Sequence, residues 1–191
     1  MIRDRSLIYH LTDLENLDSI LQHGLQPRCE LNNDEFNDVA DGEILDSRAN
    51  HSLDNFVPFH FFAKNPFDYG VQRTHSGKDF VLISVQRTTA RANGWQIVPT
   101  HPLAEEGYQI LAYDAGFSAI DWELMEERDY DDRACKVACM AECLSPTSVN
   151  PNLIFCIYIK EARVKAVVDR LVNSHNVNCH VDINSAMFVG E

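Results

Sequence analysis

Five short segments of the chain are rich in apolar residues, either alternating with polar ones or almost continuous, and predict β-strands. These segments are residues 7–12, 56–63, 80–86, 153–160 and 177–183. In the first, successive side chains point to opposite sides, which puts Ile8, His10 and Thr12 on one face. The fourth is almost continuously apolar, which favours a central position in a sheet, and the last alternates as a half-exposed strand does.

Four other segments repeat apolar side chains every three or four residues and predict helices. These segments are residues 14–23, 121–127, 132–143 and 161–173. Thr12 or Asp13 can cap the first helix, and Gly24 can end it, because glycine adopts the left-handed conformation common at helix ends. Asn65-Pro66 is interpreted as a break after the second strand. Strands spread along the chain with few helices between them predict a mixed α+β fold.

A polar stretch from Cys29 to Asn55 separates the first predicted helix from the second strand. It carries eight carboxylates and a single cation, Arg48. The stretch has little periodicity and predicts a long loop. Loops longer than ~12 residues in compact domains are usually functional or disordered.

Length and composition are those of an ordinary globular protein. The 191 residues predict one domain over residues 1–191, and shares of 45% hydrophobic and 24% charged residues exclude disordered, collagen-like and coiled-coil chains. No segment approaches the ~18 continuous apolar residues of a membrane span, and the first residues lack the apolar core of a signal peptide. We therefore expect a cytoplasmic protein with no membrane partner.

The net charge of −13, from 29 acidic and 16 basic residues, opposes non-specific adhesion to nucleic acid. Any nucleic-acid role needs a local basic site. Basic residues gather in two parts of the chain: Arg73, Lys78, Arg87 and Arg91, and Lys160, Arg163, Lys165 and Arg170. A groove for a single strand, with a few aromatic platforms, needs only some of these cations.

The six cysteines indicate packing rather than disulfides or metal binding. An even count without a secretory signal is weak evidence for disulfides. Cys135, Cys139 and Cys143 recur every four residues, but they lack the close pairs or the histidine partner of a metal site. We expect no metal and small, buried thiols.

Three motifs follow one another in a fixed order. They are Tyr9-His10-Leu11-Thr12 with a helix that ends in Gly24-Leu25, Val57-Pro58-Phe59-His60-Phe61 with Pro66 and Tyr69 behind it, and Ala141-Glu142-Cys143-Leu144. In this order and spacing they resemble the DarT family of nucleic-acid ADP-ribosyltransferases, over nearly the whole chain. Members of that family carry Tyr-His-Ile-Thr, Val-Pro-Phe-Tyr-Phe, Pro-Met-Leu-Tyr and Ala-Glu-Phe-Leu. His60 thus replaces a tyrosine, and Phe67-Asp68 replaces Met-Leu. These departures leave the positions of the implied catalytic residues unchanged, and we expect them to affect which base is the target.

The resemblance implies an α+β, ADP-ribosyltransferase-like fold, in which two small, mostly antiparallel sheets form a cleft for NAD and helices lie at the periphery. It implies that NAD is consumed as a substrate and that ADP-ribose passes to a base of single-stranded nucleic acid, DNA rather than RNA. It further implies a bacterial toxin or anti-phage effector, with an antitoxin or another accessory protein as a partner. By position in the motifs, Glu142 and Arg48 are the implied catalytic residues. The implied NAD-binding residues are His10, Leu11, Thr12, Ser19, Arg48, Phe59 and Tyr69.

These residue types suit the chemistry. Cleavage of a glycosidic bond passes through an oxocarbenium-like state, which a carboxylate such as that of Glu142 can stabilise. The guanidinium of Arg48 suits bidentate recognition of the NAD pyrophosphate. The chain has neither G-x-G-x-x-G nor G-x-x-x-x-G-K-[ST], so a Rossmann or P-loop nucleotide site is not expected.

Other interpretations stay open at this point. Glu142 alone reads as a solvated carboxylate on a helix, His10 as a structural histidine, and Arg48 as an ion-pair partner of Asp46 or Glu43 within its loop. The same enzyme class with an RNA or protein acceptor, and a non-catalytic NAD-binding regulatory module, are the alternative functions. The acidic surface favours a protein acceptor, and the ordered motifs favour nucleic acid. We expect the loop between Ile110 and Glu142 to set the target base.

Overall fold

The computed structural model describes residues 1–31, 52–101 and 109–190. Within these ranges, the strands are β1 (Leu7–Asp13), β2 (Val57–His60), β3 (Phe80–Gln86), β4 (Gln96–Val98), β5 (Leu111–Ala112), β6 (Glu142–Ser145), β7 (Cys156–Ile159) and β8 (His180–Ile183). The helices are α1 (Leu17–His23), α3 (Pro66–Thr74), α4 (Arg87–Ala92), α5 (Tyr113–Ala119), α6 (Trp122–Glu127), α7 (Arg133–Cys139) and α8 (Ala162–Ser174). Among the described residues, every helix is too short or too polar to cross a lipid bilayer.

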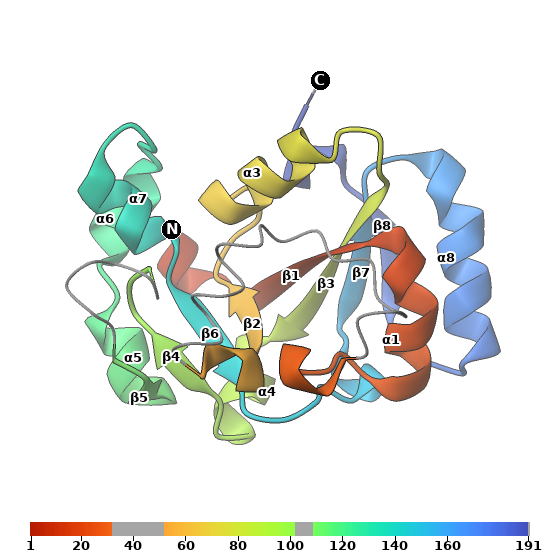
Figure 1. Cartoon of the computed structure of the whole chain (residues 1–191), viewed down its shortest axis with the longest axis horizontal. Coiled ribbons are helices and arrows are strands. Elements are labelled where there is room, and N and C mark those ends of the chain that lie inside the picture. The colour runs from red at the N-terminus through yellow and green to blue at the C-terminus, as the bar shows by residue number, and fades with distance from the viewer. Residues whose placement is uncertain (32–51, 102–108, 191) are drawn as a thin grey trace.

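The strands form one mixed sheet in the order β5-β4-β6-β2-β1-β3-β7-β8 (Figure 1). The α+β class is confirmed, but the expected two small sheets are a single sheet in the described part of the chain. Only one residue pair, Tyr9 with His60, joins β1 to β2 there, whereas seven pairs join β1 to β3. The single sheet thus has two parts that are joined by a narrow junction.

The sheet is covered on both faces. Ile8, Ile83 and Ile157 lie in the main core, together with α1 and α8, which lie side by side (Figure 1). Side chains of the opposite alternation, such as Tyr9 and Leu82, pack in a second cluster with Val71 of α3. The predicted face of β1 that carries Ile8, His10 and Thr12 is thus confirmed, because Leu7, Tyr9 and Leu11 belong to the other cluster.

Several predicted elements match the structure closely, while others differ. Residues 80–86, 121–127 and 161–173 correspond to β3, α6 and α8 within one residue. Gly24 ends α1 with a φ of 90°, and the Asp13 carboxylate accepts a hydrogen bond from the Glu15 N–H at the start of the preceding turn. The predicted strands around β2, β7 and β8 are longer than the observed ones, and β7 lies next to the edge strand rather than centrally.

One predicted helix is wrong for a physical reason, and one predicted strand break is confirmed but has a further role. Residues 132–143 do not form one helix: α7 ends at Cys139, and Glu142 begins β6, because residues 142–145 pair with both β2 and β4. Asn65-Pro66 does not merely end a strand. The Asn65 side chain accepts a hydrogen bond from the Asp68 N–H, and Pro66 takes the first turn of α3, where its missing N–H costs nothing.

All six cysteines are free thiols, and four are buried. Cys135 and Cys139 face the core from α7, and Cys143 faces it from β6. Burial raises the pKa of Cys156 and of Cys179 to about 11, which keeps both protonated at neutral pH. The prediction that these side chains pack as small hydrophobes holds for the buried four.

Candidate active site

The strand junction between β1 and β2 is the structural centre of the candidate site. Beyond the Tyr9–His60 pair, no further β1–β2 pairing occurs in the described residues. Instead, His10 Nδ1 lies 2.8 Å from the carbonyl oxygen of Pro58. The N–H and C=O of a strand residue point the same way, so the Pro58 nitrogen, which has no hydrogen, also faces β1. Pro58 therefore prevents ladder formation at the place where the two halves of the sheet separate.

His10 and Phe59 face each other across this separation. Their rings are 5.6 Å apart between centroids, and Phe59 is fully buried against Trp95. His10 is only half-buried. Its ring is thus held by a backbone carbonyl and an aromatic neighbour while part of it stays accessible, as a ligand-binding histidine requires.

Glu142 is the first residue of β6 and is only 4% exposed. It stands opposite His60 of β2 on one side and Val98 of β4 on the other. Tyr9, His60, Glu142 and Val98 form one row across four adjacent strands. Since neighbouring strands are ~4.8 Å apart, the backbone of Glu142 lies roughly 10 Å from that of β1. The interpretation of Glu142 as a solvated helix carboxylate is wrong.

Two predicted ligand residues of β1 have limited access. Leu11 is buried in the second hydrophobic cluster, so only its backbone can meet a ligand. Thr12 is 2% exposed, and its hydroxyl accepts a hydrogen bond of 3.3 Å from the Asn16 side chain. By strand alternation, Thr12 and His10 lie on the face opposite to that of Tyr9 and the Glu142 row.

Ser19 and Tyr69 lie on exposed helix surfaces. Ser19 is on the side of α1 away from the buried Leu17 and Ile20. Tyr69 on α3 is 38% exposed, and the Arg73 guanidinium lies over its ring at 4.6 Å. Neither residue contacts Glu142 through an interaction defined in the described ranges, so their assignment to NAD binding stays a prediction. Arg48, together with Asp46 and Glu43, lies outside the described residues.

The segment between Ile110 and Glu142 is not a simple loop, because it contains α5, α6 and α7. Several contacts hold it against the residues that directly follow β2, and two of them come from the α6–α7 connection. The Tyr130 hydroxyl donates a 2.8 Å hydrogen bond to the carbonyl of Lys64, and the Arg128 guanidinium lies 5.0 Å from the centre of the Phe62 ring. The segment that was expected to set the target base is therefore attached to the chain just after the candidate site.

Asp68 is a buried carboxyl that the sequence analysis noted only as a departure from the family. It is 1% exposed; its Oδ2 accepts a 2.9 Å hydrogen bond from the Lys64 N–H, and its Oδ1 has no hydrogen-bond partner among the residues that the structure describes. Burial raises the pKa of Asp68 to about 7. Residue type alone does not reveal such a group, but a charged residue in the first turn of a helix that starts Asn-Pro is a recognisable signal.

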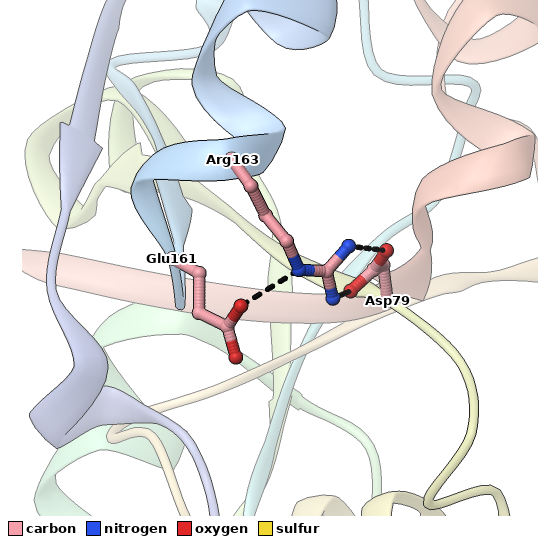
Figure 2. Close-up of polar contacts among 3 residues, drawn as sticks. All are labelled: Asp79, Glu161 and Arg163. Carbon is pink, nitrogen blue, oxygen red and sulfur yellow. Dashed lines mark hydrogen bonds and ion pairs between the residues drawn. The ribbon is translucent and has the colours of Figure 1, made fainter.

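Four of the eight cations in the two basic groups pair with carboxylates of the protein. Lys78 pairs with the buried carboxylate of Asp13, and Arg91 pairs with Asp114. Figure 2 shows Arg163 bridging Asp79 and Glu161, with distances of 2.9 Å and 2.7 Å for two of its bonds. Lys165 pairs with Asp169. These cations do not form an open basic groove.

Arg87 is structural. It is 6% exposed and donates hydrogen bonds to the carbonyls of Leu7, Arg3 and Phe61, at 3.1, 2.9 and 3.0 Å. Burial lowers its pKa. Because Leu7 begins β1 and Phe61 directly follows β2, this side chain fastens the two strands to each other on the opposite side of the Tyr9–His60 pair from His10.

Comparison with known proteins identifies a matching sequence family and a relative of this chain. The sequence model described as "ssDNA thymidine ADP-ribosyltransferase, DarT" matches residues 9–189. A "DNA ADP-ribosyl transferase-DNA ADP-ribosyl glycohydrolase fusion protein" of Thermosipho africanus (strain H17ap60334) is 26% identical over 184 residues, covering 89% of this chain and 46% of the relative. The chain thus spans about half the length of that curated relative.

The fold is shared with solved structures. Thermus sp. 2.9 DarT in complex with ADP-ribosylated ssDNA has a TM-score of 0.83 at 17% identity, covering 96% of each chain. The same Thermus protein in complex with NAD+ gives 0.79 at 15% identity, covering 97% of this chain and 98% of that one. Thermosipho africanus DarTG in complex with ADP-ribose gives 0.78 at 23% identity, covering 96% of this chain and 51% of that one. The expected ADP-ribosyltransferase-like fold is confirmed.

Proposed function

Since the chain belongs to the DarT family of ssDNA thymidine ADP-ribosyltransferases, we propose that it transfers ADP-ribose from NAD to thymidine in single-stranded DNA. In this reaction the bond between nicotinamide and ribose breaks, a bond forms between the ribose and the base, and the base gives up a proton. NAD is consumed. We propose that residues 1–191 carry this activity as one domain.

The observation that carries the proposal is the position of Glu142. It is a nearly buried carboxylate at the first residue of β6, one strand away from the break between β1 and β2. A carboxylate held beside an opening in the sheet can bind ribose hydroxyls and stabilise positive charge that develops on the sugar. Low exposure strengthens that electrostatic interaction, because water screens it less.

The residues at the break suit an NAD molecule bound beside Glu142. His10 is fixed through Nδ1 and offers its remaining ring edge, and the fully buried Phe59 packs against the His10 ring and supports it. Beyond Tyr9, the β1 backbone has hydrogen-bonding groups directed toward β2 that no β2 residue pairs with in the described part of the chain. In the proposal, these groups bind the carboxamide and the ribose, and Arg48 holds the pyrophosphate.

The partners follow from the relatives. The Thermosipho protein combines a DNA ADP-ribosyl transferase with a DNA ADP-ribosyl glycohydrolase in one chain. We infer that this chain acts as a toxin or anti-phage effector whose product a glycohydrolase removes, and that such an enzyme, or another antitoxin, is its partner in the cytoplasm. RNA remains an alternative acceptor, and the test below includes it.

The test uses the whole chain, NAD labelled in its adenosine part, and matched 20-nucleotide oligonucleotides with or without thymidine. We expect label on thymidine-containing single-stranded DNA only, with mass spectrometry of the digested nucleosides locating the ADP-ribose. Duplex DNA and RNA of the same sequence serve as controls. Absence of transfer to every oligonucleotide contradicts the activity, and transfer to RNA alone contradicts the choice of DNA.

A further inference from the structure

We propose that His60 is the positioning residue of Glu142: its imidazole, on the adjacent strand, holds the direction of the Glu142 carboxylate. The proposal rests on the function proposed above, in which Glu142 stabilises the charge that develops on ribose. His60 is not among the residues that the family motifs assign to NAD or to catalysis, and a tyrosine occupies its place in the family motif.

The strand register places the two side chains next to each other. His60 and Glu142 are directly opposed in the antiparallel pair β2–β6. Side chains of such pairs share a face, and their Cβ atoms are ~4.5–5.5 Å apart. At that separation an imidazole nitrogen and a carboxylate oxygen lie within reach of a hydrogen bond. Exposures of 6% and 4% shield both side chains from water, and a hydrogen bond formed between shielded groups is stronger than one formed in water.

The surroundings of His60 limit its movement. Tyr9 opposes it from β1, and the Phe67 ring of α3 lies 5.8 Å from the imidazole. Phe67 is itself held, because Asn65 caps α3 and the Asp68 carboxylate binds the Lys64 N–H in the same turn. An aromatic ring on one side and a paired strand on each flank leave the imidazole few rotamers. A group that is fixed in this way can fix its neighbour.

Orientation is what Glu142 needs. A carboxylate at the start of a strand has two side-chain torsions before its terminal group, and stabilisation of the transition state depends on where its oxygens point. Val98, the other cross-strand neighbour of Glu142, is apolar and donates no hydrogen bond. Of the two side chains that flank Glu142 in the sheet, His60 alone is polar. The hydroxyl of the family's tyrosine would supply the same kind of donor from the same strand position.

The experiment compares three variants of the whole chain. His60→Phe keeps a ring of similar size and removes both nitrogens, while His60→Gln and His60→Tyr each keep a polar group. We expect His60→Phe to lower kcat by about 10- to 100-fold with the KM for NAD within about twofold of wild type, because small displacements of a catalytic group cost this much. We expect His60→Gln or His60→Tyr to restore most of kcat. The control is His23→Phe, which changes an exposed histidine of α1 and leaves kcat unchanged.

A double-variant cycle separates positioning from mere packing. If His60 acts through Glu142, His60→Phe adds little further loss of kcat when Glu142 is already glutamine. Multiplicative losses in that cycle, or a His60→Phe protein with wild-type kcat, overturn the proposal. Equal kcat losses in all three His60 variants, in step with their melting temperatures, overturn it as well. These outcomes leave the proposed function standing, whereas a wild-type chain that transfers no ADP-ribose contradicts the proposed function itself.

Discussion

The two halves of the sheet are built differently. The long-strand half, named for the seven-residue strands β1 and β3, also includes the four-residue strands β7 and β8, and the short-strand half comprises β2, β6, β4 and β5. In the long-strand half, seven consecutive pairs join β1 to β3, and the interior of β3 and β7 is almost entirely apolar. In the short-strand half no strand exceeds four residues, and His60 and Glu142 are buried within it.

The long-strand half contributes mainly to stability, and the short-strand half carries the candidate catalytic carboxylate. Burial of apolar side chains in the long-strand half stabilises the fold at ~25 cal/mol per Å². Both halves carry an opposing cost, since a buried polar group costs free energy unless it is well hydrogen-bonded: the long-strand half buries Thr12, Asp13 and Ser84, and the short-strand half buries His60 and Glu142. A protein retains such a cost where the group serves another purpose. The halves meet at one residue pair, and His10, Phe59 and Glu142 lie around this pair.

The largest expected effect is on turnover, in the short-strand half. Glu142→Gln keeps the size of the side chain and removes its charge. We expect kcat for ADP-ribose transfer to fall by ~10² or more, with little change in NAD affinity, because the lost interaction belongs to the transition state. Single-turnover transfer and calorimetry with NAD measure the two quantities. A variant that turns over at the wild-type rate removes Glu142 from catalysis.

The second effect is on stability, in the long-strand half. Ile157 of β7 is fully buried between Ile83 of β3 and Val181 of β8. We expect Ile157→Ala to lower the free energy of unfolding by ~2–5 kcal/mol, from lost burial and the cavity it leaves. Urea unfolding gives this value. Well below the melting temperature, kcat should stay near that of wild type; a large loss of kcat in the folded variant would show that the halves do not divide the two tasks.

The third effect is the pH dependence of stability that follows from the buried carboxyl of Asp68. Asp68 has its pKa raised from 3.8 to about 7, so between those values the unfolded chain releases a proton that the folded chain still holds. Stability therefore falls as pH rises from about 4 to about 7 and levels off above that range. Asp68→Asn does not titrate, so the melting temperature of the variant relative to wild type should be a few °C higher at pH 8 than at pH 5.

The control for this prediction is Glu123→Gln, at an exposed carboxylate of α6. It should shift the melting temperature equally at both pH values. A pH-independent difference between Asp68→Asn and wild type would contradict a raised pKa for the buried carboxyl.

Prediction from sequence succeeded where the pattern is local. β3, α6 and α8 follow from periodicity alone, because their apolar stripes are long enough to fix both type and bounds. It failed where pairing with segments distant in sequence determines the secondary structure. Cys135, Cys139 and Cys143 have helical spacing, yet Cys143 lies in a strand, since residues 142–145 complete a ladder between β2 and β4. The three-residue strand β4 and two-residue strand β5 are too short to show a pattern.

For the candidate site, the residue identities could be predicted from the sequence, whereas their spatial arrangement could not. The ordered motifs predicted Glu142, His10 and Phe59 as site residues, and all three lie on strands that meet near the Tyr9–His60 pair, with His10 and Glu142 on opposite faces of the sheet; their roles stay predictions. Their geometry was not predictable, because which face Glu142 shares, and with whom, is set by the register of β2 against β6. His60 was noted only as a departure from the family, and its position opposite Glu142 is a property of that register.

The smallest expected effect is at the surface of the long-strand half, where Arg163 bridges Asp79 and Glu161 (Figure 2). These hydrogen bonds raise the pKa of Arg163, but its side chain is 63% exposed, and ion pairs in such positions are screened by water and salt. We expect Arg163→Ala to change the melting temperature by no more than about 2 °C, with the difference reduced further in 0.5 M salt. Because its charge is already neutralised, the KM for single-stranded DNA should also stay unchanged, as it should in Arg163→Lys. If Arg163→Ala instead raises that KM while Arg163→Lys does not, the cation of α8 contacts DNA, and the long-strand half then takes part in substrate binding as well as in stability.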